Sequence, residues 1–117
     1  MQIDRVDIQV IGPETEHHTW SDDLPGQYQS NTLIRIYTDA GLEGIAGVWN
    51  ATSFGYDRYT AESLRHLVPI LIGRDPCERE SILHDLRPRV FPQPPGALAV
   101  IDIALWDIMG KIQDKPI

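Results

Sequence analysis

The segment from Ala99 to Lys111, AVIDIALWDIMGK, is the feature of the sequence that most restricts the fold. Its apolar side chains cover most of the surface of the helix that their spacing predicts: Val100, Ile101, Ile103, Ala104, Leu105, Ile108 and Met109. A helix that is apolar nearly all round is buried on more than one side. The sheet of a small domain covers only one side, so we expect a second neighbour for this helix.

Two aspartates interrupt the segment. Asp107 stands four residues before Lys111, so the two side chains can pair on one face of the helix. Asp102 lies on the opposite flank and needs hydrogen-bond donors if it is buried. At about 3.6 residues per turn the two carboxylates point about 140° apart, so they cannot converge on one cation by themselves. We therefore interpret both as structural, not as metal ligands or as a general acid/base pair.

Length and charge place the chain among small, acidic globular domains. Its 117 residues suffice for one domain, and its formal net charge is -7. That charge, with dispersed basic residues, argues against binding to nucleic acid or to an anionic membrane. Cys77 is a single cysteine and cannot form an internal disulfide. The alternating, charged start MQIDRVDIQV is not typical of a targeting signal, so we expect a cytoplasmic protein.

Three segments predict β-strands. Val6, Ile8 and Val10 alternate with polar residues, which is the period of a strand with one buried face. The segment NTLIRIYT at 31–38 is rich in β-branched and aromatic residues, and GIAGVWN at 44–50 contains two glycines that permit close backbone approach. Gly41, in the connection between these two segments, can adopt the positive φ of a tight hairpin. We therefore expect a three-stranded antiparallel meander.

Three helices are expected after the strands. The first begins near Asp57 and is broken or kinked at Pro69, with Gly73 ending the following turn. The second begins at DPCE, where Asp75 can cap, Pro76 suits the first turn and Glu78 completes a capping box. Its buried face is formed by Ile82, Leu83, Leu86 and Val90, and Pro88 limits its length. Strands followed by helices favour an α+β fold.

Two irregular segments separate these elements. The first, GPETEHHTWSDDLPGQYQS at 12–30, is polar and is expected to be a long loop, and the second is NATSFGY at 50–56. Long loops in compact domains are commonly functional. Trp106, in the last helix, is expected to pack in the core or at a domain interface.

Three phrases of the chain resemble a known family: LIRIYTDAGLEGIAGV, LIGRDP, and ALAVIDIALWDIMGK followed by a proline. In order and spacing they are similar to the N-terminal domain of the enolase superfamily, and most of all to the mandelate racemase and muconate lactonizing enzyme group. The resemblance implies that residues 1–117 form an α+β capping domain, a three-stranded antiparallel meander followed by three helices. In that family a TIM-barrel domain follows directly, and this barrel, absent from the chain, would be the second neighbour of the apolar helix.

The resemblance also implies the chemistry of the parent protein. Family members abstract a proton α to a carboxylate and stabilise the enediolate on Mg²⁺, with metal ligands and acid/base residues on barrel strands. No catalytic or metal residue is therefore assigned to this chain, and the fragment is expected to be inactive alone. The expected parent is a Mg²⁺-dependent isomerase or lyase, either an acid-sugar dehydratase or a racemase/cycloisomerase, acting on a carboxylate-bearing small molecule. A homo-oligomer is compatible with this interpretation.

In the family, the two irregular loops close over the barrel mouth and shape the substrate pocket. The resemblance therefore makes His17, His18, Trp20 and Tyr56 the candidate substrate-binding residues. The alternative for the histidines is that they are solvated loop residues. The alternative for Trp20 and Tyr56 is that they anchor their loops by packing.

A second hypothesis comes from another class of function. The chain would then be a free-standing interaction module that uses the former barrel-facing surface to bind another chain or itself. Self-association, or dye binding to exposed apolar surface, would fit a missing domain.

Overall fold

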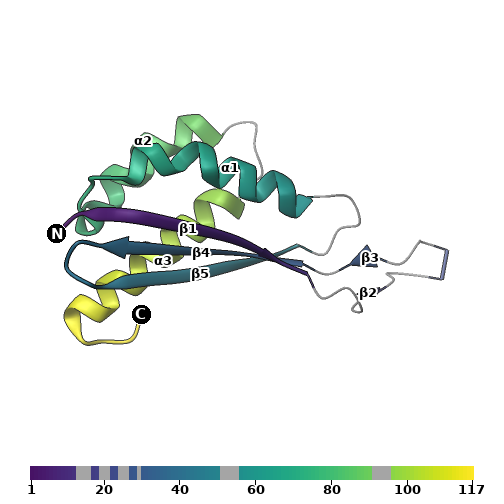
Figure 1. Cartoon of the computed structure of the whole chain (residues 1–117), viewed down its shortest axis with the longest axis horizontal. Helices are drawn as coiled ribbons and strands as arrows, with labels where there is room; N and C mark the ends of the chain where they lie inside the picture. The colour runs from purple at the N-terminus through teal and green to yellow at the C-terminus, as the bar shows by residue number, and fades with distance from the viewer. Residues whose placement is uncertain (13–16, 19–21, 24–26, 29, 51–55, 91–95) are drawn as a thin grey trace.

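Three antiparallel strands form one layer of the protein in the computed structural model of the chain (Figure 1). They are β1 (Ile3–Ile11), β4 (Ser30–Thr38) and β5 (Glu43–Asn50), in the order β1-β4-β5. The structure describes residues 1–12, 17–18, 22–23, 27–28, 30–50, 56–90 and 96–117, and the side chains of these except 17–18, 27–28, 30, 49–50 and 56–59. The predicted meander is confirmed.

The β4–β5 hairpin has the turn that the sequence predicts. Gly41 has a φ of 79°. The amide of Gly41 donates to the carbonyl of Thr38 at 3.0 Å, and the amide of Thr38 donates to the carbonyl of Leu42 at 2.9 Å. Glycine adopts such a positive φ without a steric penalty. The pairing then runs from Tyr37 opposite Glu43 to Ser30 opposite Asn50.

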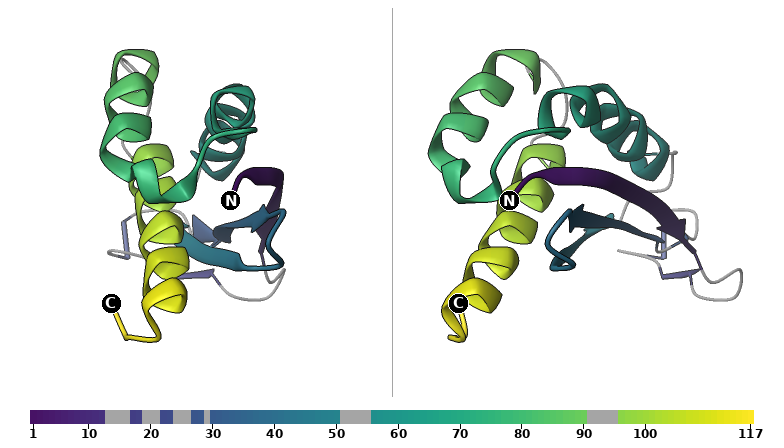
Figure 2. Two further views of the ribbon diagram at one scale, coloured as in Figure 1. Left: turned by 90° about the vertical axis from the view of Figure 1, so that its left-hand side faces the viewer. Right: turned by 60° about the vertical axis from the view of Figure 1, so that its left-hand side comes forward.

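Three helices and a 3₁₀ turn form the second layer and cover one face of the sheet (Figures 1 and 2). They are α1 (Tyr56–Leu71), η1 (Pro76–Glu78), α2 (Arg79–Val90) and α3 (Gly96–Gln113). The α+β class and the order of three strands before three helices agree with the sequence. The expected long loop at 12–30 differs, because it contains a short two-stranded sheet of β2 (His17–His18) and β3 (Gln27–Tyr28). Strands this short show no alternating pattern in a sequence.

Two prolines lie close to the ends of their helices, as the sequence predicts, since each helix ends two residues after its proline. Both Pro69 and Pro88 lie inside a helix, and α1 and α2 continue to Leu71 and Val90. Leu71 and Val90 are buried in the core. Tertiary packing of an apolar residue in the last turn can outweigh the local cost of a proline, because most helix stability in proteins comes from such packing.

The start of the second helix follows the predicted cap only in part. The Asp75 side chain accepts a hydrogen bond from the amide of Cys77 at 2.9 Å, and Pro76 occupies the first turn. Glu78, expected to complete a capping box, instead lies 4.0 Å from the guanidinium of Arg74. Arg74 also donates to Asp85 at 2.8 Å, so these charges hold the turn against α2.

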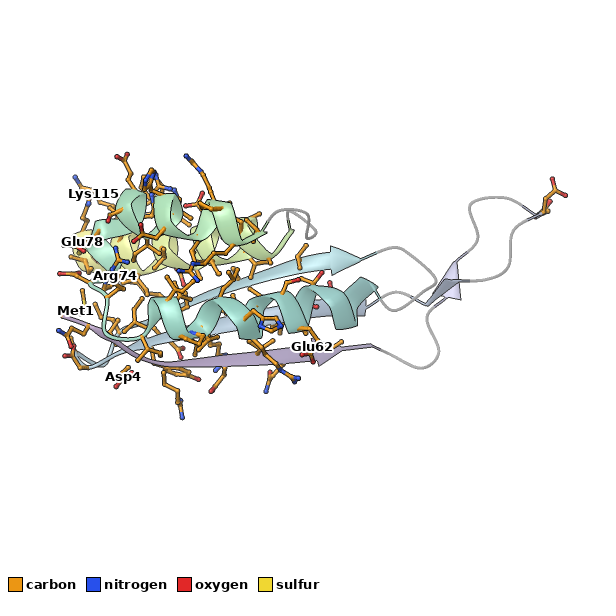
Figure 3. The ribbon with its side chains drawn as sticks, turned by 90° about the horizontal axis from the view of Figure 1, so that it is seen from above. Met1, Asp4, Glu62, Arg74, Glu78 and Lys115 are labelled. Carbon is orange, nitrogen blue, oxygen red and sulfur yellow. The ribbon has the colours of Figure 1, made fainter. Side chains whose placement is uncertain are left out.

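The backbone after α1 closes one edge of the sheet. Gly73, with a φ of 83°, donates its amide to the carbonyl of Ile3 at 2.8 Å, and Ile3 donates to the carbonyl of Arg74 at 2.9 Å. Seen from above, α1 runs along β1 and leads to Arg74 at the end of the molecule where Met1 lies (Figure 3). The chain thus pairs with the beginning of β1.

The core lies between the sheet and the three helices. Burial along β1 decreases from Ile3, which is buried, through Val6 and Ile8, which are partly buried, to Val10, which is exposed. The expectation of a buried face for Val6, Ile8 and Val10 is therefore only partly met, since β1 is an edge strand. The largest fully buried side chains are Ile3, Ile34, Ile36, Leu64, Leu67, Leu71, Ile82, Leu86, Val100, Ile101, Leu105 and Ile108.

Helix α3 approaches β5 closely at Gly44. A Cβ atom on Gly44 would stand 2.1 Å from the carbonyl oxygen of Ala104 and 2.7 Å from Cγ1 of Ile108. No side chain fits in this space, so the predicted close backbone approach is confirmed at this glycine.

Candidate functional site

One end of the sheet gathers the segments that the sequence assigns to substrate binding. Strand β1 ends at Ile11, β4 begins at Ser30, β5 ends at Asn50 and α1 begins at Tyr56. All of these lie away from the β4–β5 hairpin, and β2 and β3 lie beyond them (Figure 1). The topology therefore brings His17, His18 and Tyr56 to the same end of the molecule. Their side chains, and Trp20 as a whole, lie outside the described residues.

The side of α3 that faces away from the sheet is apolar and exposed. Ile103 is 47% exposed and Trp106 is 41% exposed, whereas Val100 and Leu105 are buried by the chain itself. A groove of about 440 Å³ lies along this side. We call this surface the α3 outer face, and it is formed by Ile103, Trp106, Met109, Gly110, Gln113, Lys115, Pro116 and Ile117. The second neighbour that the sequence predicts would therefore cover this side only.

Trp106 is held on the α3 outer face by α2. The guanidinium carbon of Arg79 lies 4.6 Å from the centre of the Trp106 ring, a distance at which a cation and an aromatic ring attract. Arg79 also forms an ion pair with Asp102. Asp102 therefore has the donor that we expected it to need, and Trp106 is not in the core. Sequence reasoning missed Arg79, because nothing in its local pattern predicts a contact with residues of α3.

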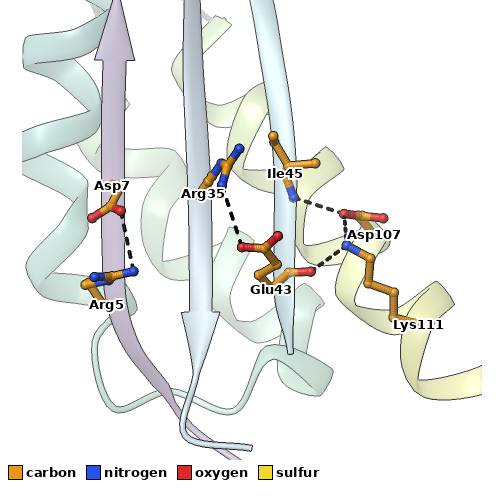
Figure 4. A network of polar contacts seen from close by, with 7 residues as sticks. All are labelled: Arg5, Asp7, Arg35, Glu43, Ile45, Asp107 and Lys111. Atoms are coloured by element: carbon orange, nitrogen blue, oxygen red, sulfur yellow. Dashed lines mark hydrogen bonds and ion pairs between the residues drawn. The ribbon is translucent and has the colours of Figure 1, made fainter. Parts of the chain in front are cut away.

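Asp107 and Lys111 connect α3 to the exposed edge of β5 (Figure 4). The Asp107 carboxylate accepts from the Ile45 amide at 3.0 Å and from Lys111 Nζ at 2.8 Å. Lys111 Nζ also donates to the carbonyl oxygen of Glu43 at 2.7 Å. The predicted pairing of Asp107 with Lys111 is confirmed. The contacts with the strand could not be foreseen from the spacing of the two residues.

The hydrogen bonds of Asp107 set its pKa. Desolvation by burial acts to raise this pKa, but the hydrogen bond from Lys111, the hydrogen bond from the Ile45 amide and the charge of Lys111 together outweigh it. The pKa of Asp107 therefore lies below its ordinary value of 3.8. The charged form of Asp107 is the form that stabilises the fold.

We expect this carboxylate to make stability depend on pH. Because its pKa is lower in the folded chain than in the unfolded chain, its contribution is complete at neutral pH. The contribution is lost as the pH falls from about 3.8 through the lower folded value. Urea unfolding at pH 6 and at pH 3 should show a smaller acid-induced loss for Asp107→Asn than for the wild type. Equal losses in the two proteins would contradict this.

The described residues do not fit a Mg²⁺ site. Among them no group of three or more His, Cys, Asp or Glu side chains could hold a metal ion. The two aspartates of α3 are engaged with Arg79 and Lys111.

The pKa of the Cys77 thiol is raised by desolvation and by Asp75, so this thiol is protonated at neutral pH. In the part of the chain that the structure describes, no helix combines the length and apolarity needed to cross a bilayer.

Comparison with known families decides the identity of this fold. The family model of the mandelate racemase / muconate lactonizing enzyme, N-terminal domain, matches residues 23–117. The chain belongs to this family. The match covers β4, β5 and the three helices of the MR/MLE N-terminal domain, including the α3 outer face.

Individual relatives agree with the family. D-galactonate dehydratase family member RspA of Cellvibrio japonicus is 37% identical over 89 residues, which are 72% of this chain and 21% of RspA. A solved structure from Pseudovibrio sp., assigned to the mandelate racemase/muconate lactonizing enzyme group, is 33% identical with a TM-score of 0.89. The alignment covers 98% of this chain and 31% of the Pseudovibrio chain. L-talarate dehydratase from Polaromonas sp., crystallised with Mg and L-glucarate, has the same fold, with a TM-score of 0.81 and 19% identity. This alignment covers 96% of this chain and 32% of the dehydratase chain.

These relatives are much longer than this MR/MLE N-terminal domain. The chain spans 21% of RspA and 31% of the Pseudovibrio protein. The relatives therefore carry most of their residues in a part that has no counterpart among residues 1–117.

Proposed function

We propose that the chain is the substrate-capping N-terminal domain of a Mg²⁺-dependent enolase-superfamily enzyme. The enzyme would be an acid-sugar dehydratase or a racemase/cycloisomerase that removes a proton α to the carboxylate of its substrate. The observation that carries the proposal is the α3 outer face, which is apolar and exposed on a chain that matches only a fifth to a third of its relatives' length.

The α3 outer face suits a permanent partner domain. Exposed apolar side chains that gather in one groove, rather than lying singly, suit an interaction surface. Trp106 stands in it with the guanidinium of Arg79 over its ring, and an aromatic side chain with few rotatable bonds loses little conformational freedom when a partner covers it. Residues 115–117 line the same groove, so a chain that continues past Ile117 would leave from its rim. A C-terminal barrel domain of the same parent is the partner that we propose.

The end of the sheet away from the β4–β5 hairpin is proposed to face the substrate. The family places its substrate-covering loops at the two segments that contain His17, His18, Trp20 and Tyr56. The backbone of His17, His18 and Tyr56 lies at one end of the molecule, which supports this proposal. Imidazole and phenol groups can donate and accept hydrogen bonds, which suits a hydroxy acid. The dehydratase names among the relatives support an acid-sugar substrate. The Mg²⁺ ligands would belong to the partner domain, because the described residues do not fit them.

The first test is catalytic and uses the chain and its parent in parallel. The purified 117-residue chain, supplied with Mg²⁺ and an acid sugar such as D-mannonate, is expected to show no turnover. A parent protein that contains a following barrel should dehydrate, racemise or cycloisomerise such an acid. Turnover by the chain alone, or a parent that lacks a barrel, would refute the proposal.

The second test addresses the α3 outer face directly. An apolar dye such as 1-anilinonaphthalene-8-sulfonate is expected to bind the isolated chain, and Ile103→Lys with Trp106→Lys should remove most of the fluorescence gain. Ile72→Lys is the matched control, because Ile72 is 44% exposed and lies outside this surface. Dye binding that the control lowers as much as the α3 variant would contradict the assignment. A saturable, discrete dimer lost only in the α3 variant would favour the free-standing interaction module instead.

A further inference from the structure

Strand β5 is an edge strand with little protection from its own side chains. Its neighbour in the sheet is β4 on one side only. The segment EGIAGV at 43–48 carries one charged residue, Glu43. Exposed edge strands offer unpaired N–H and C=O groups to the strand of another chain, and proteins commonly block them with charges or with a covering element. The β5 edge therefore needs another kind of protection.

The side chains of Asp107 and Lys111 occupy two hydrogen-bonding groups of this edge, one amide and one carbonyl. The carboxylate of Asp107 accepts the amide of Ile45 at 3.0 Å, as the carbonyl of an added strand would. The ammonium of Lys111 donates to the carbonyl of Glu43 at 2.7 Å, as the amide of an added strand would. The two groups are bonded to each other at 2.8 Å, and they present an acceptor and a donor side by side (Figure 4).

The position of this pair is fixed by the backbone. Gly44, which lies between the two bonded residues of β5, packs against the carbonyl of Ala104 on α3. Helix α3 therefore cannot move along β5 without losing this contact. The other edge of the sheet is also occupied at one residue. The backbone of Gly73 and Arg74 forms hydrogen bonds with the carbonyl and the amide of Ile3 on β1.

We propose that Asp107 and Lys111 act as a side-chain substitute for a fourth strand and keep β5 of a second copy of this chain from adding to the β5 edge. The strand that they exclude is β5 of a second copy, because β5 is an edge strand and two identical edge strands can pair antiparallel about a two-fold axis. The proposal does not depend on the proposed function, since it concerns the sheet edge and not the α3 outer face.

The test compares two double variants of the full chain. Asp107→Ala with Lys111→Ala opens the edge, and Glu62→Ala with Arg65→Ala is the control. The control removes the same two charges from an exposed pair on α1. Sedimentation velocity over a range of concentrations should show that the edge variant self-associates at least about tenfold more tightly than the control. A change of about tenfold is the effect expected of about one backbone hydrogen bond formed at the opened edge. The α3 outer face is unchanged in both, so association through it contributes equally.

Hydrogen exchange at the Ile45 amide identifies where association occurs. In dilute edge variant this amide should exchange about tenfold faster than in the control, and it should become protected again as the variant associates. Adding Ile45→Lys to the edge variant should return association to the control level, since a lysine on an edge strand opposes strand addition. If the double variant does not fold, Asp107→Ala alone frees the Ile45 amide, leaves Lys111 in place and is judged by the same criteria. Association equal to the control, or an Ile45 amide that exchanges as in the wild type, would overturn the proposal.

Discussion

Gly44→Ala is expected to lower the free energy of unfolding by about 3 kcal/mol or more, at the upper end of the range for an overpacked site. The added methyl group would stand 2.1 Å from the carbonyl oxygen of Ala104 and 2.7 Å from Ile108. The first of these atoms belongs to a helix backbone, which cannot rotate away as a side chain can. Relief therefore requires α3 to move from β5, and that movement would also stretch the bonds of Asp107 and Lys111 to the strand. Urea unfolding followed by circular dichroism measures the loss.

Gly47→Ala is the matched control on the same strand. Its Cβ would stand 2.7 Å from Cδ2 of Leu33, the far end of a flexible and only partly buried side chain. That side chain can turn away, and alanine is less costly to order than glycine. We expect a change within about 1 kcal/mol. Similar losses for the two alanine variants would show that the contact with Ala104 does not set the position of α3.

Leu105→Ala is expected to cost about 3 kcal/mol, within the range for truncating a fully buried leucine. Leu105 is completely buried between α3 and the rest of the core, so the substitution removes apolar contacts and leaves a cavity. Chemical denaturation should show a lower midpoint with little change in the slope of the transition.

Ile103→Ala provides the comparison on the other side of the same helix. Ile103 is 47% exposed in the chain, so its truncation should cost less than about 1 kcal/mol there. In a parent protein whose barrel covers the α3 outer face, the same substitution should become markedly more destabilising. An equal cost in the chain and in the parent would count against coverage of this face. A cost equal to that of Leu105→Ala in the isolated chain would contradict burial on one side only.

The elements that sequence reasoning predicted well depend on local signals. The hairpin required a positive φ, which Gly41 supplies, and the cap at Asp75 follows from its own side chain. The all-round apolarity of α3 correctly indicated a surface beyond the chain's own core. Pro69 and Pro88 likewise mark the ends of their helices to within two residues, and burial of the residues that follow them is a tertiary effect.

The candidate surfaces were only partly predictable for the same reason. The spacing of Asp107 and Lys111 predicts their pairing but not their bonds to β5, which is far away in the sequence. The contact of Arg79 with Asp102 and Trp106 likewise depends on how α2 crosses α3. The assignment of His17, His18, Trp20 and Tyr56 to the substrate remains a prediction that rests on family resemblance and on the shared end of the fold.

The pairing of β1 with β4 also determines how the domain tolerates changes in chain length. Ile11 lies opposite Asn31 in this ladder, so the sheet holds the two ends of the intervening segment together. The entropy of closing a flexible loop grows only slowly, by about 0.6 kcal/mol for each doubling of its length. Insertions and deletions between β1 and β4 should therefore change the stability of the three-stranded sheet only slightly.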